Sequence, residues 1–418
     1  MKALSIALVF CLALCGANAA HYAVLVAGSN MFYNYRHQAD VYHAYQTLIK
    51  NGFEKDNIVT FAYDDIANDP QNPFPGKVYN KPATDEGQDV YAGVQIDYKG
   101  KDVTPDNFLA VLKGSDILKK QGKKVLESTE EDNVFIFFSD HGATGLIAFP
   151  YEYLYANNFM STLNWMSQNK KYKQMVIYIE ACESGSMFEG ILPQNISIYA
   201  TTAANSEESS WGTYCSPNDK VNGKSIGSCL GDLYSVNVWE NIDAVDPSQE
   251  TLITQFGILV QKTNLSHVQR FGDVSISNQI IGSFEANQAS SKGPMKLQYE
   301  EVKENTNVDS RYNKLYYLQN KHQNLQSSAS ASAVAEEIAS IQKYDNTFTK
   351  IAEQFNLNTN AKVKDIDFAC LKQRVALYEE LCGKFSDYGL KYVRHIHYTC
   401  TQGVDLYDFE LALLNKCL

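Results

Sequence analysis

The stretch of sequence that decides the fold reads Met175-Val176-Ile177-Tyr178-Ile179-Glu180-Ala181-Cys182-Glu183-Ser184-Gly185-Ser186. An apolar run that ends at small, turn-forming residues is typical of a buried strand in a mostly parallel sheet. Such sheets bind their ligands just beyond the carboxyl ends of the strands. Cys182 therefore falls where chemistry is expected.

A second apolar run has the same form, because residues 134–139 lead directly into Asp140-His141-Gly142. Two neighbouring strands would then present the Cys182 thiol and the His141 imidazole at one edge, which is the pair that a thiol hydrolase needs. One alternative is an inert buried cysteine beside a structural histidine. A zinc site is a weaker alternative, because no C-x-x-C or H-x-x-x-H spacing surrounds either residue. We predict neither a metal nor a cofactor.

Strand and helix signals alternate through the first two thirds of the chain, which predicts an α/β fold with a parallel sheet and helices on both faces. The expected strands are 22–27, 58–63, 134–139, 175–180 and 196–201. The expected helices are 38–51, 104–122 and 161–169, and residues 68–100 are rich in loop-forming Pro, Gly, Asn and Asp.

The composition changes near residues 286–293 to Asn, Gln, Ser, Lys and Gly, which indicates a linker. Strand signals vanish beyond it, and residues 327–354 and 368–381 have helical spacing. We expect a signal peptide over 1–19, a catalytic domain over 20–285, a linker over 286–320 and a separate α-helical domain, stapled by disulfides, over 321–418.

The N-terminus predicts entry into the secretory pathway. Lys2 precedes an apolar stretch that ends at Cys15, and the small residues Ala17 and Ala19 suit cleavage after Ala19. No apolar run reaches the length of a membrane-spanning helix, so no membrane segment is predicted. The sequons at Asn195 and Asn264 are candidate glycosylation sites.

Cysteine usage agrees with an oxidising compartment. Of nine cysteines, Cys11 and Cys15 lie in the signal peptide, and an odd number remains, which leaves one thiol unpaired. Cys215 and Cys229 bracket a polar loop and form a natural local bridge. The four C-terminal cysteines can form two more bridges, so the unpaired thiol is Cys182.

The charge of the chain is unevenly distributed. Residues 308–418 carry 13 basic and 13 acidic groups, so the net charge of −12 lies entirely in residues 1–307. This balance argues against nucleic acid as a partner.

Several motifs together resemble the legumain (asparaginyl endopeptidase, vacuolar processing enzyme) family of caspase-like cysteine proteases. The matching stretches are 26–30, 33–40, 63–67, 102–105, 107–112, 140–142, 180–186, 199–205 and 231–237. They cover nearly all of 22–285, whereas the C-terminal segment is similar mainly in its length and its four cysteines. The bridged loop looks more like that of the plant-type members.

The resemblance implies a caspase-like catalytic domain and assigns catalytic roles. Cys182 would be the nucleophile, and His141 the acid/base that protonates the leaving amine. Asn34 would hydrogen-bond the histidine, and the N–H groups of Gly142 and Cys182 would form the oxyanion hole. Asp140 is either a supporting residue or a solvated loop acid. In this family substrate binding completes the Cys/His arrangement.

The resemblance also implies a pocket for an asparagine side chain, which offers one acceptor and two donors. Arg36 would donate to the amide oxygen, while Glu180 and Asp232 would accept from the amide nitrogen. The further matching pocket positions are His37, Ser209 and Ser210. The partners would be proteins or peptides with an accessible Asn.

The C-terminal domain would be the family's pro-domain, an intramolecular inhibitor that acid releases in a lysosome or vacuole or after secretion. Its basic groups would pair with acidic groups of the catalytic domain until carboxylates protonate below about pH 5, and His322, His395 and His397 would add positive charge. We predict self-processing after Asn307, with Asn305 and Asn287 as other sites, in an exposed polar loop. We predict the pairs Cys370–Cys400 and Cys382–Cys417, although the spacing leaves other connectivities open.

Two alternatives to a protease stay open. A peptide ligase or transpeptidase would use the same catalytic residues, with an amine in place of water. A non-catalytic secreted binding protein is less consistent with an intact Cys182, His141 and pocket.

Overall fold

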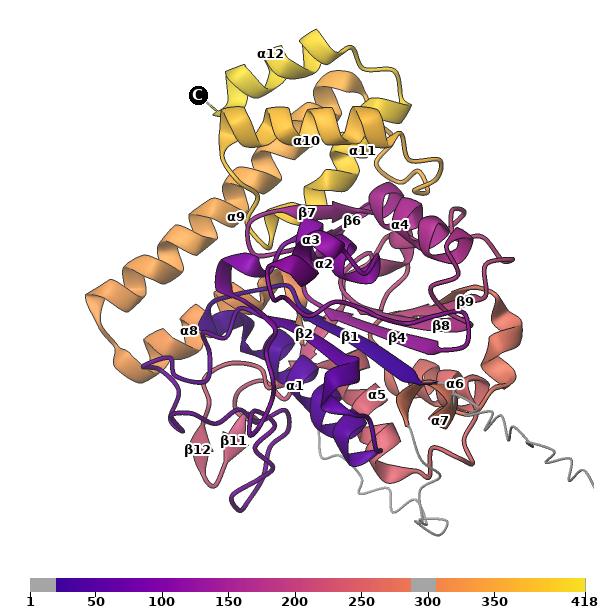
Figure 1. The fold of residues 1–418 in the computed structure, drawn as a ribbon. Helices are drawn as coiled ribbons and strands as arrows, with labels where there is room; N and C mark the ends of the chain where they lie inside the picture. The colour runs from indigo at the N-terminus through magenta and orange to yellow at the C-terminus, as the bar shows by residue number, and fades with distance from the viewer. Residues whose placement is uncertain (1–19, 287–305, 418) are drawn as a thin grey trace, which may run out of the picture.

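A seven-stranded, mostly parallel sheet forms the centre of the computed structural model, which describes residues 20–286 and 306–417 (Figure 1). Its strand order is β14-β9-β8-β4-β1-β2-β3, and only β14 runs antiparallel to its neighbour. The strands are β1 (His21–Ala27), β2 (Ile58–Ala62), β3 (Tyr98–Lys99), β4 (Asn133–Ser139), β8 (Gln174–Glu180), β9 (Ile198–Thr202) and β14 (Gln269–Gly272).

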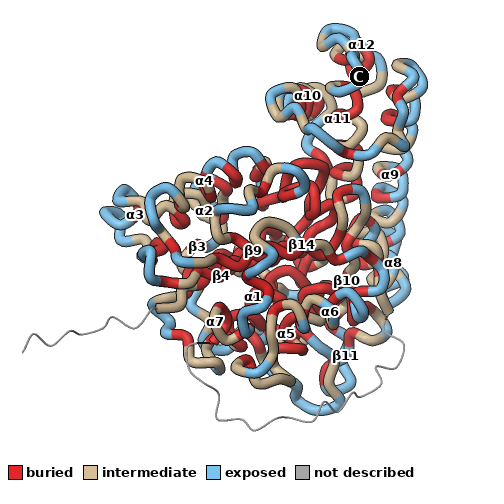
Figure 2. The backbone as a smooth tube through the Cα atoms, turned by 90° about the vertical axis from the view of Figure 1, so that its right-hand side faces the viewer, coloured by how far each residue is buried: buried red, intermediate tan, exposed pale blue. Residues whose placement is uncertain are grey.

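Helices cover both faces of this sheet, because successive strand residues point to opposite sides. In β1, Leu25 packs into one apolar core and Val24 into the other. The first core lies under α1 (Tyr35–Lys50), α5 (Leu233–Ala244), α6 (Leu252–Lys262) and α7 (Gly282–Glu285). The second lies under α2 (Pro105–Leu112), α3 (Asp116–Lys120) and α4 (Ala156–Gln168). Figure 2 shows β4 and β9 buried between these layers.

The register of the central strands brings the two predicted catalytic segments together. Ser139 at the end of β4 pairs with Glu180 at the end of β8. His141 and Cys182 each follow their paired residue by two positions, so both lie at the carboxyl edge of the sheet. The nearby small sheets are β5 (Gly142–Ala143) with β6 (Leu146–Ala148) and β7 (Tyr153–Tyr155), and β10 (Trp211–Thr213) with β13 (Gly231–Asp232) and β15 (Val308–Asp309). A hairpin of β11 (Lys220–Val221) and β12 (Lys224–Ser225) lies in the loop closed by the Cys215–Cys229 bridge.

The C-terminal part is helical, as expected. It comprises α8 (Asn313–Leu325), α9 (Ser328–Phe355), α10 (Phe368–Cys382), α11 (Val393–Thr401) and α12 (Leu406–Cys417). The bridge Cys370–Cys400 ties α10 to α11, and Cys382–Cys417 ties α10 to α12. The aromatic ring of Phe348 stacks on that of Tyr392, 4.6 Å away, inside this domain. In Figure 1, α10, α11 and α12 sit over β6, β7 and α4, while α9 extends back to α8 at the side of the sheet.

Two expectations about secondary structure are wrong. Residues 104–122 form two helices, because Gly114 adopts a φ of +67° and Ser115 caps a new helix by accepting from the Leu118 N–H. Strand structure also does not end at the linker, since Val308–Asp309 forms β15. This two-residue strand exists only through its pairing with β10, and so it leaves no periodic signal in the sequence.

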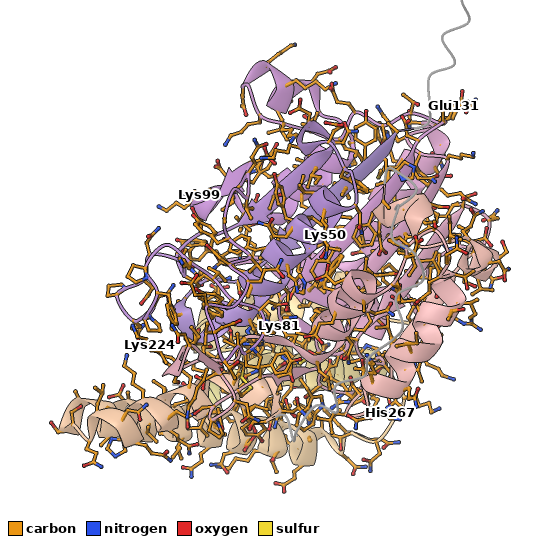
Figure 3. The ribbon with its side chains drawn as sticks, turned by 90° about the horizontal axis from the view of Figure 1, so that it is seen from below. Lys50, Lys81, Lys99, Glu131, Lys224 and His267 are labelled. Atoms are coloured by element: carbon orange, nitrogen blue, oxygen red, sulfur yellow. A yellow bond between two sulfur atoms is a disulfide. The ribbon has the colours of Figure 1, made fainter. Side chains whose placement is uncertain are left out.

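The surface away from α10–α12 is charged and solvated, as the side chains of Lys50, Lys81 and Lys224 show in Figure 3. Asn195 and Asn264 are both exposed, and glycosylation there stays a prediction. Across residues 20–286 and 306–417, no helix combines the length and apolar character needed to cross a membrane. The predicted signal peptide, Asn287 and Asn305 lie outside the described residues.

Candidate active site

The nucleophile candidate Cys182 lies fully buried at the turn after β8 and is the free cysteine of the described chain. The backbone N–H of Ser210 donates to its Sγ at 3.3 Å, and the Ser210 hydroxyl lies 3.8 Å from the same sulfur. Burial raises the pKa of the Cys182 thiol, against the opposing charge of Arg311. The thiol is therefore held neutral, and not activated, in this form of the protein.

His141 follows β4 and has its two ring nitrogens in different surroundings. Its Nε2 lies 3.0 Å from Asn34 Oδ1, the contact that the family resemblance implied. Its Nδ1 is buried and has no hydrogen-bond partner among the described residues. Because Nε2 faces Asn34 and Nδ1 has no partner, Nδ1 is the nitrogen that can exchange a proton with a substrate.

Gly142 is required by the close approach of the two catalytic turns. A Cβ at this position would lie 2.4 Å from the Cys182 carbonyl oxygen and 2.9 Å from Ala181 Cβ, so a larger residue would force the turns apart. The backbone of Gly142 thus lies beside that of Cys182, as an oxyanion hole formed by their N–H groups requires.

Three charged residues predicted for the pocket come together from distant elements. Arg36 from α1 donates through Nε to Asp232 Oδ1 at 2.8 Å, and all three side chains of Arg36, Asp232 and Glu180 are buried. Glu180 Oε2 accepts from the backbone and hydroxyl of Ser235, each at 3.0 Å. Burial raises the pKa of Glu180 and of Asp232, although Arg36 partly opposes the shift at Asp232.

One polar atom of each of these pocket residues has no hydrogen-bond partner among the described residues. These atoms are Arg36 Nη2, Glu180 Oε1 and Asp232 Oδ2. Native proteins rarely leave buried polar groups unpaired, and such groups at a site need a ligand or water to satisfy them. The pocket thus has one donor atom and two acceptor atoms that can hydrogen-bond a polar ligand.

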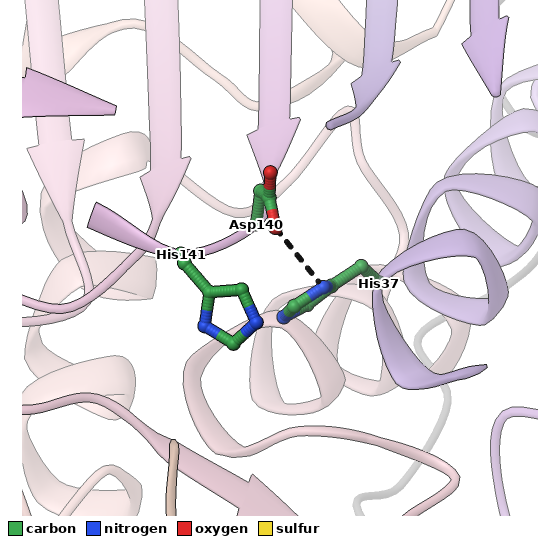
Figure 4. Close-up of side chains that lie close together, drawn as sticks. All are labelled: His37, Asp140 and His141. Carbon is green, nitrogen blue, oxygen red and sulfur yellow. Dashed lines mark ion pairs between the residues drawn. The ribbon is translucent and has the colours of Figure 1, made fainter. Parts of the chain in front are cut away.

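His37 and Asp140 form a buried pair close to His141 (Figure 4). His37 Nδ1 lies 2.7 Å from Ser29 Oγ and 3.4 Å from Asp140 Oδ1, and its Nε2 lies 3.6 Å from Asp232 Oδ2. Asp140 is 3% exposed, so the alternative of a solvated loop acid is wrong. Possible ligand atoms of His37, Asp140 and His141 lie within 4.8 Å of one another, but hydrogen bonds to Ser29 and Asn34 already engage both histidines.

Asp40 is a pocket residue that sequence reasoning missed. It is buried, its Oδ1 accepts from Asn80 Nδ2 at 2.8 Å, and both of its oxygens lie 3.3 Å from the Asp232 N–H. Burial and the neighbouring Asp232 raise its pKa. Asp40 stands in the matched stretch 33–40, which was the one signal that could have pointed to it.

The segment after the predicted processing site occupies the cleft. β15 pairs antiparallel with β10, with Val308 opposite Gly212 and Asp309 opposite Trp211. The Ser310 N–H donates to the Ser210 carbonyl at 3.0 Å, and the two hydroxyls of these serines lie 3.4 Å apart. Ser310 is therefore the residue of this segment that lies next to Cys182 and the pocket.

Two more residues of the C-terminal part bind the catalytic groups, and neither was predicted. Arg311 donates through Nη2 to the Gly142 carbonyl at 2.6 Å and lies 3.6 Å from Glu183 Oε1. Asp387 Oδ2 lies 3.2 Å from His141 Nε2, and Arg311 Nη1 donates to the Asp387 backbone carbonyl at 3.1 Å. Burial alone would raise the pKa of Asp387, but its contact with His141 holds that pKa well below its ordinary value.

The surroundings of Asn307 differ from the exposed loop that we expected. Asn307 is half-buried and directly precedes Val308, which is buried and pairs with β10. The residue before Asn307 is also bound, because the Thr306 carbonyl accepts a hydrogen bond from the Cys215 N–H. Ser209 is half-buried next to Ser210 in the chain.

His395 and His397 of the C-terminal part are also enclosed, and burial lowers the pKa of both, to about 4 for His395. They are neutral near pH 7 and resist protonation.

Comparison with known proteins agrees with this arrangement. The model described as "Peptidase C13 family" matches residues 21–329, and the one described as "Legumain, prodomain" matches residues 319–417. The vacuolar-processing enzyme delta-isozyme of Arabidopsis thaliana is 39% identical over 96% of this chain and 91% of its own length. Legumain of Canavalia ensiformis is 37% identical over 95% and 88%, and legumain of Mus musculus is 47% identical over 66% and 62%.

The fold, the Cys/His site and the matched pro-domain define a cysteine endopeptidase held as a zymogen. The chain belongs to the peptidase C13 family, the family of the legumains and vacuolar-processing enzymes. The names of these relatives are consistent with a lysosomal, vacuolar or secretory location for them.

Proposed function

We propose that this protein hydrolyses peptide bonds after asparagine. The unpaired atoms of the pocket carry this proposal, because they complement a carboxamide: Arg36 Nη2 can donate to its oxygen, and Glu180 Oε1 and Asp232 Oδ2 can accept from its two N–H groups. A site built to hydrogen-bond a substrate group rejects analogues that lack it by large factors, since the buried partners then stay unpaired.

Aspartate should be accepted only in acid. A protonated Asp side chain offers one donor and one acceptor and so resembles Asn. An ionised Asp would place a third carboxylate against Glu180 and Asp232, and like charges at such short range repel strongly. Cleavage after Asp should therefore fall as the pH rises through the range in which the substrate carboxyl ionises.

The proposed mechanism follows from the positions of the catalytic groups. Cys182 attacks the carbonyl carbon of the cleaved bond while its thiol proton passes to His141, and the oxyanion forms between the N–H groups of Gly142 and Cys182. His141 then protonates the leaving amine, and water resolves the acyl-enzyme. In the zymogen Ser210 contacts the thiol, and the ring of His141 is bound by Asn34 and Asp387, so binding of a substrate has to complete the pair.

The test uses the acid-treated enzyme and a peptide library with every residue at the position before the cleaved bond. We expect cleavage after Asn at all pH values where the enzyme is active, and after Asp in acid only. The matched control is Cys182→Ala, which removes the nucleophile and little volume. Preference for Lys, Arg or aromatic residues, or turnover by Cys182→Ala, would overturn the proposal.

We further propose that acid opens the zymogen, but not by protonating Asp387. The pKa of Asp387 is held so low that this carboxylate stays ionised in a vacuole or lysosome. Glu183 is a better acid sensor, because burial raises its pKa despite Arg311, so it takes up a proton early and loosens the contact with Arg311. Inside the pro-domain, buried neutral His395 must charge as the pH falls.

Processing after Asn307 remains part of this proposal, with a constraint. Ser310, three residues further on, is hydrogen-bonded to Ser210, the residue that contacts Cys182, so the Asn307–Val308 bond is not presented to the cysteine of its own chain. Cleavage there therefore needs another molecule of the enzyme, or prior release of the segment from the cleft.

A further inference from the structure

The segment beside β10 is extended and strand-paired, as a peptide substrate would be in the proposed function. Its hydrogen bonds run from the Ser310 N–H, which donates to Ser210, to the Thr306 carbonyl, which accepts from the Cys215 N–H. Between them, Val308 is opposite Gly212. Ser310 lies at the pocket, but its short side chain leaves the pocket atoms unpaired, and the chain then turns into the 3₁₀ helix Ser310–Tyr312. The segment is thus aligned like a substrate without filling the site.

This alignment fixes which residue of a substrate would meet which surface. Side chains of an extended strand alternate between its two faces, so residues two places apart share a face. The Ser310 hydroxyl lies 3.4 Å from that of Ser210 beside the pocket, and Val308, two places earlier in the same segment, lies opposite Gly212. A substrate whose asparagine takes the place of Ser310 would present its residue two places before that asparagine where Val308 now lies.

The surface under Val308 is the Cys215–Cys229 disulfide. Val308, Cys215 and Cys229 are 9%, 0% and 5% exposed and form an apolar cluster of their own, separate from the larger cores. Gly212 opens space beside the bridge, because a Cβ there would lie 3.3 Å from Cys229 Sγ. We call the surface formed by Gly212 and this bridge the disulfide subsite.

The other cover of the disulfide subsite comes from the pro-domain side. Asn313 Oδ1 lies 3.0 Å from Cys229 Sγ, and the Tyr316 hydroxyl donates to the Ser216 carbonyl. Val308, Asn313 and Tyr316 all follow the Asn307–Val308 bond. Cleavage there and release of the C-terminal part would remove all three and expose the bridge beside the substrate path.

We infer that the disulfide subsite is a specificity site of the mature enzyme, which takes an aliphatic side chain two places before the cleaved asparagine. The inference rests on the proposed function, because it assumes that substrates lie where β15 lies. A buried disulfide and a glycine offer apolar contact without a charged partner, so Val or Ile is favoured there, and a charged side chain would lose its hydration without compensation.

The first experiment measures kcat/KM of the mature enzyme on peptides that differ only at this position, with Ala-Asn held constant behind it. Val and Ile should exceed Lys and Asp by about tenfold, the range expected for an apolar subsite. The double variant Cys215→Ala with Cys229→Ala should lose most of that ratio and keep its preference for Asn over Gln. Mass spectrometry must show the bridge intact in the wild-type enzyme under the reductant used in the assay.

The second experiment keeps the inference testable if the double variant does not fold. In the intact zymogen, Val308→Lys should speed labelling of Cys182 by an Asn-bearing electrophile near pH 7, while Val308→Ile should leave the rate close to that of the wild type. A flat profile at this position, with Asn cleavage intact, would overturn the inference and leave the proposed function standing. Loss of the Asn preference itself would overturn the proposed function instead.

Discussion

The contact between Asp387 and His141 should be the strongest single restraint on the closed zymogen, and Asp387→Asn tests it. The variant keeps the shape of the side chain but removes the charge that faces His141 Nε2 at 3.2 Å. Removing one member of a buried charge pair at an interface costs about 2–5 kcal/mol. The Asp387 side chain is 24% exposed, so the lower end of that range applies. We expect about 2–3 kcal/mol, which raises the open fraction about 30-fold to 150-fold.

The assay is the rate at which an Asn-bearing electrophile labels Cys182 in the uncleaved zymogen, because only the open form can react. Asp408→Asn is the matched control, since Asp408 is an exposed acid on α12 far from the cleft. The low pKa of Asp387 means that its charge persists from pH 7 to pH 4, so the gain should be nearly constant over that range. Equal labelling rates in Asp387→Asn and the wild type would refute the restraint, and a gain confined to neutral pH would refute the assignment of its charge state.

Three further predictions concern the same segment and domain. Ser310→Asn should fill the pocket and slow labelling of Cys182 relative to Ser310→Ala, or yield a new cut before Arg311 that mass spectrometry would detect. If neither result is seen, the alignment of this segment is wrong. His395→Phe should stabilise the zymogen in acid by about 2–3 kcal/mol near pH 4.5. A buried histidine with a pKa of about 4 makes the folded protein less stable as the pH falls from 6.5 to 4, and Phe removes that loss. Thermal unfolding with an unchanged pH dependence would contradict this prediction. Processing after Asn307 should accelerate with protein concentration and stop in Asn307→Ala, whereas a rate independent of concentration would indicate cleavage within one chain.

The sequence could predict the centre of the fold because long apolar strands carry their own signal. Residues 134–139 and 175–180 show buried strands, and the topology of a parallel sheet then places His141 and Cys182 at one edge. The pocket was predictable through the matched motifs alone. Nothing in the spacing of Arg36, Glu180 and Asp232 indicates that their side chains meet.

The contacts that close the zymogen could not be predicted, and the reason is physical. β15 is a strand because β10 offers it hydrogen bonds, and its two residues are too few to carry a periodic signal of their own. Asp387 lies in a connection between α10 and α11, where an acid normally faces solvent, and its role follows only from how the pro-domain sits on the sheet. Similarly, His395 was counted as a source of positive charge but is enclosed by the rings of Phe348 and Tyr392.

The position of Asn307 ahead of β15 has a consequence for how the enzyme becomes active. Ser310, Arg311 and Asp387, which contact Ser210, Gly142 and His141, all lie on the C-terminal side of that bond. Cutting the bond therefore changes the inhibitor from a tethered part of the chain into a separate ligand, with every contact still in place. Its hold on the cleft then depends on its concentration and its dissociation constant. A cut enzyme kept concentrated near neutral pH would stay inactive, and dilution alone would begin to activate it.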